Sequence, residues 1–238
     1  MPPSIAENLA ALRERIAAAA RAAGRSPEEV RLMAVSKTQP AAAVLEALRA
    51  GQTLFGENRV QEALGKMDEV ARLAPGPPGP EWHLIGHLQG NKAKLVPGRF
   101  AALHSLDSVP LADALQRQLE RAGAALDVLI QLNWAQEATK SGVTDEATLR
   151  RLVEHVRQAC PRLALVGLMT IPPPELDEAA TRALYARVRA LRDGLRAEFG
   201  LGAGFGALSM GMTHDFEWAI AEGATLVRVG TAIFGARA

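Results

Sequence analysis

The segment Val30-Arg31-Leu32-Met33-Ala34-Val35-Ser36-Lys37-Thr38-Gln39-Pro40 decides how the rest of the chain is interpreted. Its first six residues are mostly apolar, as in a buried strand, and the run ends at a Ser-Lys pair followed three residues later by proline. The sequence therefore predicts a strand that carries the amine of Lys37 at its carboxyl end. Such an amine is either a solvated strand terminus or, at the rim of a low-dielectric pocket, a nucleophile that forms Schiff bases.

The same pattern recurs along the chain as an alternation of short apolar runs and amphipathic helices. Because parallel strands need crossover connections and read as continuous apolar runs, the alternation predicts βαβ units. An open doubly wound sheet would carry a glycine fingerprint after its first strand, and Ser36-Lys37-Thr38 lacks one. We therefore predict a (β/α)8 TIM barrel with an extra N-terminal helix over residues 4–23. Strands are expected near residues 30–35, 53–58, 82–86, 100–104, 126–134, 163–169, 205–208 and 225–229, and the other helices near 41–50, 59–73, 91–96, 109–122, 144–159, 175–199 and 214–222.

Length and composition narrow the class of protein. The 238 residues suffice for one large domain, which we expect to span residues 1–238, with the proline-rich residues 75–80 as a loop within it. The 27 basic and 26 acidic residues nearly cancel, so no global field favours nucleic acid or an anionic membrane. A lone cysteine, Cys160, excludes an internal disulfide, and the lack of a signal-peptide pattern or a long apolar run predicts a cytoplasmic protein.

The predicted mouth of the barrel has the features of an anion site. In such barrels phosphate is often held by the loops after strands seven and eight, here residues 209–213 and 230–235. Both loops offer hydroxyls and backbone N–H groups, although Gly230-Thr231 alone is also typical of an ordinary strand-to-helix turn. Alternation along the last strand points Arg228 into the barrel, where it forms either a buried salt bridge or a ligand contact. Together with Lys37, these features describe a pocket for a phosphorylated aldehyde, and pyridoxal 5′-phosphate fits it well.

Eight motifs follow one another along the chain: AVSKTQP (34–40), FGENRVQE (55–62), WHLIGHLQGNK (82–92), HSLDS (104–108), TKSGV (139–143), GLMTIPP (167–173), LSMGMTHD (208–215) and VRVGTAIFGAR (227–237). In order and spacing they resemble those of the YggS/PROSC family, the pyridoxal phosphate homeostasis proteins. The resemblance covers nearly the whole chain and implies a barrel like the N-terminal domain of bacterial alanine racemase. It also implies a Schiff base between pyridoxal 5′-phosphate and Lys37, and a role in intracellular vitamin B6 homeostasis in which the protein passes the cofactor to apoenzymes.

The resemblance assigns further cofactor-binding residues. The phosphate-binding residues of the family correspond to Ser209, Gly230 and Thr231. The family's arginine near the cofactor ring corresponds to Arg228, and whether this residue contacts the ring nitrogen or the phosphate stays open.

Four more side chains are candidates near the mouth. Asn58 and His83, in the GEN and WHLIG motifs, are expected to line the pocket. Glu57 offers a carboxylate there, although exposed carboxylates are the commoner case. Lys140, in the loop after the fifth strand, offers a second amine, for which a solvated surface position is the default.

The function is expected to be binding rather than catalysis. Chemistry on a bound amino acid needs a second acid or base, and the lone tyrosine, Tyr185, falls within a helix away from the predicted mouth. We therefore predict a monomeric binding protein without catalytic residues, with an amino-acid racemase and a Schiff-base aldolase of phosphosugars as alternatives. No metal site is expected, because His83 and His87 would lie roughly 13 Å apart on a strand.

Overall fold

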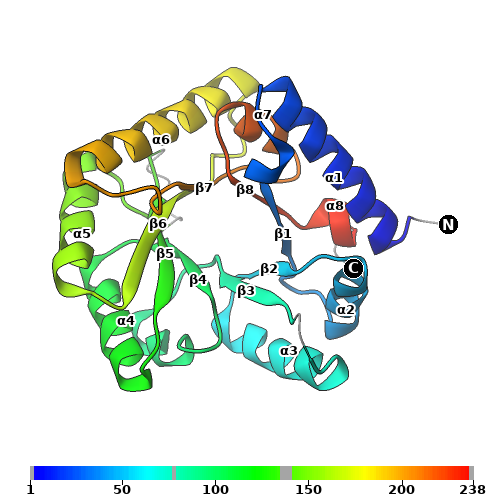
Figure 1. The fold of residues 1–238 in the computed structure, drawn as a ribbon, viewed down its shortest axis with the longest axis horizontal. Helices are drawn as coiled ribbons and strands as arrows, with labels where there is room; N and C mark the ends of the chain where they lie inside the picture. The colour runs from blue at the N-terminus through cyan, green and yellow to red at the C-terminus, as the bar shows by residue number, and fades with distance from the viewer. Residues whose placement is uncertain (1–2, 77–78, 135–140, 236–238) are drawn as a thin grey trace.

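The computed structural model describes residues 3–76, 79–134 and 141–235. Its eight strands form a closed parallel barrel in chain order, and β1 pairs with β8 to complete the ring (Figure 1). The predicted (β/α)8 architecture is confirmed. The strands are β1 Arg31–Val35, β2 Leu54–Glu57, β3 Glu81–Leu84, β4 Ala102–Leu106, β5 Leu126–Leu132, β6 Leu163–Thr170, β7 Ala207–Ser209 and β8 Leu226–Val229.

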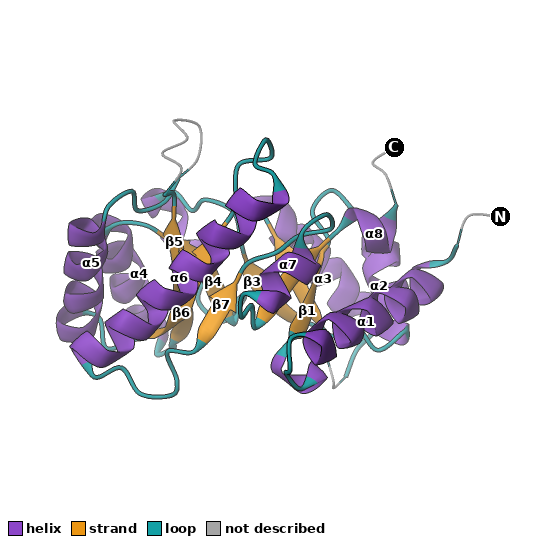
Figure 2. Cartoon of the chain, turned by 90° about the horizontal axis from the view of Figure 1, so that it is seen from above, coloured by secondary structure: helices purple, strands orange, loops and turns teal. Residues whose placement is uncertain are grey.

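Helices surround the strands and cover their outer faces (Figures 1 and 2). Two of the connecting elements are 3-10 helices, η1 before β1 and η2 between β3 and β4. The sequence pattern predicted a short helix at η2 and none at η1. The elements are α1 Ile5–Ala22, η1 Pro27–Glu29, α2 Ala41–Arg49, α3 Val60–Leu73, η2 Gly90–Leu95, α4 Val109–Ala122, α5 Glu146–Ala159, α6 Glu178–Phe199, α7 Phe216–Ala221 and α8 Thr231–Phe234.

The extra N-terminal helix, α1, is confirmed as well. It begins with a capping box in which Ser4 and Glu7 satisfy each other's backbone N–H groups. Its apolar stripe, which includes Leu9, Leu12 and Ile16, is buried. The helix lies outside the barrel against α2, α7 and α8 (Figure 1), so it joins the first and last parts of the chain.

The barrel interior follows the alternation of the strands. Leu226 joins Met33 and Leu54 in a small apolar cluster separate from the main core, whereas Val227 and Val229 belong to the core between strands and helices. Arg228 is buried and is paired in register with Met33. The predicted inward orientation of Arg228 is therefore confirmed.

Two strands, β4 and β7, begin two residues later than the apolar pattern predicted. Phe100 is buried, but its N–H donates to the Val96 carbonyl at 3.3 Å, so it belongs to the turn after η2 and β4 starts at Ala102. Phe205 likewise bonds back to Gly202 at 3.1 Å, and β7 is only three residues long. Burial alone made these phenylalanines resemble strand residues.

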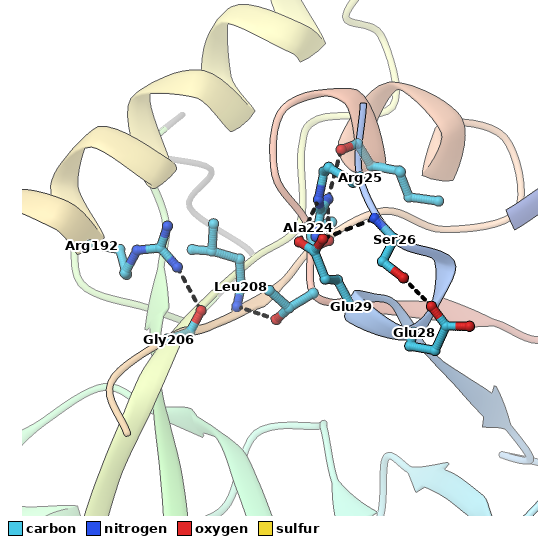
Figure 3. Close-up of polar contacts among 10 residues, drawn as sticks. Arg25, Ser26, Glu28, Glu29, Arg192, Gly206, Leu208 and Ala224 are labelled. Atoms are coloured by element: carbon cyan, nitrogen blue, oxygen red, sulfur yellow. Dashed lines mark hydrogen bonds and ion pairs between the residues drawn. The ribbon is translucent and has the colours of Figure 1, made fainter. Parts of the chain in front are cut away.

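Polar contacts fasten the amino-terminal ends of β7 and β8 (Figure 3). The Arg192 guanidinium donates to the Gly206 carbonyl at 2.6 Å, and the Leu208 N–H donates to the Thr225 hydroxyl at 2.9 Å. Arg25 donates to the Ala224 carbonyl at 2.8 Å. These bonds hold the lower rim of the barrel, opposite the mouth. None of the described helices has the length and apolar character that crossing a membrane would require.

Candidate functional site

A cavity of about 270 Å³ lies at the carboxyl ends of the strands, where β1, β2, β3, β6 and β8 end. Its walls include the apolar side chains Val35, Ile85 and Ile171. Small-molecule sites combine such walls with a few convergent polar groups. The predicted residues that line this mouth pocket are Lys37, Asn58, Arg228, Gly230 and Thr231.

Lys37 is the second residue after β1 and is half-buried. Behind it, the Ser36 hydroxyl donates to Glu57 Oε1 at 2.6 Å, and Lys66 Nζ lies 2.6 Å from both that oxygen and the Ser36 carbonyl. Glu57 is buried at the end of β2, so it is not the exposed acid that residue type suggested. The resulting ion pair ties β1 and β2 to α3 and fixes the backbone that carries Lys37.

The residue after this lysine is held in an unusual conformation. Thr38 has a φ of +65°, and in the described part of the chain it is the one residue other than glycine with a positive φ. A β-branched residue is disfavoured in this region, and such strain clusters at functional sites. Thr38 also lines the mouth pocket.

Asn58 supplies an acceptor that the described residues leave without a partner. Its Oδ1 atom is buried and has no hydrogen-bond donor within reach among them. An unsatisfied buried carbonyl costs about 1–3 kcal/mol, so it needs an explanation such as a bound donor. The backbone at Gly86, just after β3, lies very close to the backbone at Asn58. A Cβ atom on Gly86 would be 2.1 Å from the main-chain carbonyl oxygen of Asn58, so this position requires glycine.

Arg228 is the cation of the pocket. Its Nη1 donates to the carbonyl and hydroxyl of Ser209 at 2.5 and 2.8 Å, and its Nη2 donates to the Thr170 carbonyl at 2.9 Å. Burial lowers the pKa of the guanidinium to about 10, so it remains charged at neutral pH. Hydrogen bonds to the described residues thus use three of its five N–H donors and involve neutral oxygens, which fits a ligand contact better than a salt bridge.

The loop after β8 also reaches the pocket. Gly230 precedes α8, and Thr231 is its first residue. The helix has only four residues, so its end supplies a few unpaired N–H groups rather than a sizeable macrodipole. A Cβ atom on Gly230 would lie 3.1 Å from the Val35 carbonyl oxygen, which shows how closely this loop approaches β1.

Two predicted residues are not brought to the pocket surface. The Ser209 hydroxyl is buried and contacts Arg228 and His104 instead. His83 lies deeper in the barrel, with Nε2 2.7 Å from Glu81 and Nδ1 2.9 Å from His104. Strand alternation explains the second case, because inward residues recur every two positions and Ile85, not His83, is the one that reaches the mouth.

Other side chains at the mouth were missed or assigned differently from sequence. His214 lines the pocket and was not among the residues predicted from sequence. Tyr185 is on α6 as predicted, but its hydroxyl donates to Asp215 Oδ2 at 2.9 Å, so it reaches the loop after β7. Lys140 lies outside the described residues.

A group of three side chains on the outside of the barrel has the composition of a metal site. Asp113, His155 and Cys160 place one ligand atom each within 4.8 Å of one another. However, His155 Nε2 and Asp113 Oδ1 are 2.7 Å apart, as in a hydrogen bond. Burial, with Asp113 and Glu120 nearby, raises the pKa of the Cys160 thiol to about 11, whereas a metal binds the thiolate. We interpret the group as a contact between α4 and α5.

Comparison with known proteins places the chain in a family. Residues 8–238 match the family model described as alanine racemase, N-terminal domain. The pyridoxal phosphate homeostasis protein of Pseudomonas aeruginosa is 48% identical over 234 residues, which cover 98% of this chain and 96% of the relative. The chain belongs to the family of pyridoxal phosphate homeostasis proteins.

Two further proteins extend the comparison. The pyridoxal phosphate homeostasis protein of Escherichia coli K12 is 46% identical over 98% of this chain and 97% of its own length. Among solved structures, PipY of Synechococcus elongatus with PLP bound is 40% identical, with a TM-score of 0.84, and the match covers 98% of this chain and 100% of PipY. The expected resemblance to this family is confirmed over essentially the whole chain.

Proposed function

We propose that this protein binds pyridoxal 5′-phosphate covalently through Lys37 in the mouth pocket and takes part in vitamin B6 homeostasis. The observation that carries the proposal is the convergence of Lys37, Arg228 and Gly230-Thr231, from opposite ends of the chain, on one cavity. The names of the relatives and the cofactor in PipY support it. The cofactor supplies an aldehyde, which condenses with a primary amine with loss of water.

The donor and acceptor groups of the pocket fit this cofactor. Asn58 Oδ1 is a buried acceptor without a donor among the described residues, and a ligand N–H, such as that of a protonated Schiff base, is a suitable donor. Arg228 keeps donors available for an anionic or ring acceptor. Val35, Ile85 and Ile171 provide apolar walls for the ring and exclude water.

The phosphate end is proposed to lie at the loops after β7 and β8. Thr231 offers a hydroxyl, and the backbone N–H groups that open α8 have no acceptor within the helix. Gly230 lets a phosphate approach the backbone because it carries no side chain. Ser209 contributes through Arg228, since its hydroxyl is committed to Arg228 and His104.

We propose that the bound cofactor is held and transferred rather than used in catalysis. The Tyr185 hydroxyl is bonded to Asp215 and buried, so it is not offered to a substrate. A guanidinium in the pocket disfavours a second positive charge on the pyridine nitrogen, which weakens the cofactor as an electron sink. A monomeric one-domain protein that passes the cofactor to apoenzymes completes this proposal.

One observation favours a second function, an amino-acid racemase. His214 lines the same cavity as Lys37, and an imidazole is a suitable general acid or base. Incubation with L- and D-alanine in deuterium oxide separates the two functions. Exchange of the α-proton that is lost in His214→Ala would establish catalysis, whereas a carrier shows no exchange above the free cofactor.

Binding is tested by spectroscopy and mass mapping. We expect pyridoxal 5′-phosphate to give the purified protein a visible absorbance band that borohydride abolishes, leaving a pyridoxyl mass on the peptide with Lys37. The band should be absent in Lys37→Ala and unchanged in Lys94→Ala, which alters an exposed lysine. Asn58→Leu should weaken binding by about tenfold, because the ligand loses the hydrogen-bonding groups of the amide.

Two outcomes would contradict the proposal. The first is a pyridoxyl mass confined to other lysines. The second is no absorbance band at a millimolar concentration of cofactor, which would leave the aldolase of phosphosugars to be tested. Transfer is checked separately, by the rate at which the loaded protein activates a cofactor-free aminotransferase compared with an equal concentration of free cofactor.

A further inference from the structure

A chain of hydrogen-bonded side chains crosses the barrel interior from the mouth pocket to the opposite opening. Arg228 Nη1 is 2.8 Å from the Ser209 hydroxyl, which is 2.9 Å from His104 Nδ1. His104 Nε2 is 2.9 Å from His83 Nδ1, and His83 Nε2 is 2.7 Å from Glu81 Oε1. The first four side chains are buried, and they come from β8, β7, β4 and β3.

The two ends of this chain determine its hydrogen positions. Arginine only donates, and an ionised carboxylate only accepts. When both imidazoles are neutral, His83 donates from Nε2 to Glu81 and accepts at Nδ1 from Nε2 of His104. Nδ1 of His104 is then an acceptor, so the Ser209 hydroxyl accepts from Arg228 and donates to His104. Every bond points from the mouth toward the lower carboxylate, and both histidines carry their proton on Nε2.

Charge keeps this arrangement in place at neutral pH. Burial, with contributions from His83, Arg228 and Arg31, lowers the pKa of His104 well below its usual value, so the ring stays neutral and Nδ1 stays an acceptor. The hydrogen bond from His83 holds the pKa of Glu81 at about 2, which keeps the carboxylate ionised. Tyr185 on α6 and Asp215 before α7 also act on Arg228 and favour its charged form.

The lower end of the chain meets a separate cavity of about 460 Å³. Glu81, His83 and His104 line it, as do Glu28, Glu29 and Gly206, which Figure 3 labels at the rim of the barrel. Arg31 and Asp127 are the other charged groups that face this cavity. The row of hydrogen-bonded side chains thus connects the solvent-accessible carboxylate of Glu81 with the guanidinium of Arg228 in the mouth pocket.

We propose that His104 is a positioning residue for the mouth pocket, which acts on Arg228 through Ser209. Because His104 accepts a hydrogen bond from the Ser209 hydroxyl, a lone pair of the hydroxyl oxygen faces Nη1 of Arg228. This bond and the bond from Nη2 to the Thr170 carbonyl fix the orientation of the guanidinium plane. His83 and Glu81 fix the tautomer that makes this possible. The inference rests on the proposed function, since it assigns the pocket's affinity for pyridoxal 5′-phosphate in part to residues beneath it.

The tautomers are tested without any cofactor. Nitrogen-15 NMR of the imidazole rings in the ligand-free protein should show His104 neutral at pH 7, with Nε2 protonated and Nδ1 unprotonated, and should show a proton on Nε2 of His83. In Ser209→Ala, the Nδ1 resonance of His104 should move toward the value of a nitrogen without a hydrogen-bond donor. Protonation of His104 on Nδ1 would overturn the proposal, whether or not the cofactor binds.

The effect on the pocket is measured by cofactor titration of matched variants. His104→Phe keeps a ring but removes both nitrogens, and we expect affinity for pyridoxal 5′-phosphate to fall about fivefold to tenfold. His104→Gln keeps one acceptor and one donor, so its affinity should stay within about twofold of the wild-type value. His155→Phe, at the contact between α5 and α4 outside the barrel, is the control and should match the wild type.

The outcomes separate this inference from the proposed function. If the wild type binds and all three variants bind equally well, His104 has no positioning role. If the wild type does not bind, the proposed function fails, and the NMR experiment still decides the hydrogen-bond arrangement. Should His104→Phe fold poorly, as judged by circular dichroism, Ser209→Ala replaces it, with a fall in affinity expected and an unchanged affinity as the contrary result.

Discussion

The two ends of the barrel interior differ in how completely their buried polar groups are hydrogen-bonded. At the lower end, Glu81, His83 and His104 satisfy one another through short hydrogen bonds. At the mouth, Asn58 Oδ1 has no donor among the described residues, and Thr38 has a disfavoured backbone conformation. Both ends hold buried polar atoms, but among the described residues that line the two cavities the unpaired buried side-chain atom, Asn58 Oδ1, lies at the mouth.

This difference shows that burial of a polar residue does not by itself identify a ligand site. His83 is buried and near the barrel axis, as sequence reasoning required of a site residue, yet both its ring nitrogens already have partners. Unmet hydrogen-bonding capacity and backbone strain are the better signals, because folding tolerates them only where something else benefits.

The largest effect is expected at the ion pair behind Lys37. Lys66→Met leaves the Glu57 carboxylate buried without its cation, since Glu57 is only 1% exposed. We expect the free energy of unfolding in urea to fall by about 3–5 kcal/mol. The double variant Glu57→Met/Lys66→Met should recover most of this loss, and Lys94→Met, at an exposed lysine, should change stability by less than about 0.5 kcal/mol. A small effect of Lys66→Met would show that the mouth does not depend on this pair.

A smaller effect is expected where the chain closes on Asn58. Gly86→Ala would bring a Cβ atom to 2.1 Å from the Asn58 carbonyl oxygen, which forces a backbone shift. Stability should fall by about 1–3 kcal/mol, and cofactor binding should weaken with it. Gly65→Ala in α3, where no atom lies within 4 Å of the new methyl group, should instead raise stability by up to about 1 kcal/mol. Equal behaviour of the two variants in urea unfolding would contradict the close approach.

The smallest effect is expected at the lower end and depends on pH. The pKa of Glu81 is about 2 in the folded protein, mainly because His83 donates to it, compared with an ordinary value of 4.5. Its contribution to stability is therefore complete above about pH 4.5 and is lost as the pH falls through 2. The side chain is 38% exposed, so we expect less than about 1 kcal/mol. The difference in unfolding free energy between wild type and Glu81→Gln should shrink over this range, and a constant difference would argue against the lowered pKa.

The fold was predictable because its main signal is local. Short apolar runs such as the one that ends at Ser36 alternate along the chain with amphipathic helices such as α1. Each strand–helix unit spans about 30 residues, so its pattern can be recognised without information from the rest of the chain. Strand boundaries were less certain, since Phe100 and Phe205 are buried by turns rather than by strands. A residue buried in a turn can be distinguished from one buried in a strand only when the backbone hydrogen bonds are known.

The site was predictable in part. Lys37 and Arg228 follow from strand ends and alternation, and the family motifs added Asn58. Lys66 was not found, because a lysine in the middle of a helix gives no sign that it reaches a carboxylate nine residues earlier. The link from His104 to Arg228 was also missed, since it joins strands that are far apart in sequence. Such contacts can be identified only when the closed barrel brings these elements together in space.

Closure of β1 against β8 also has a consequence for synthesis. Lys37 and Arg228 are about 190 residues apart in the sequence, and ribosomes add about 5–20 residues per second. The amine therefore leaves the ribosome roughly 10–40 seconds before the strand that completes its pocket. Under the proposed function, a chain still being synthesised binds no cofactor. Each new molecule begins to bind free cofactor only after β8, its last strand, has been translated.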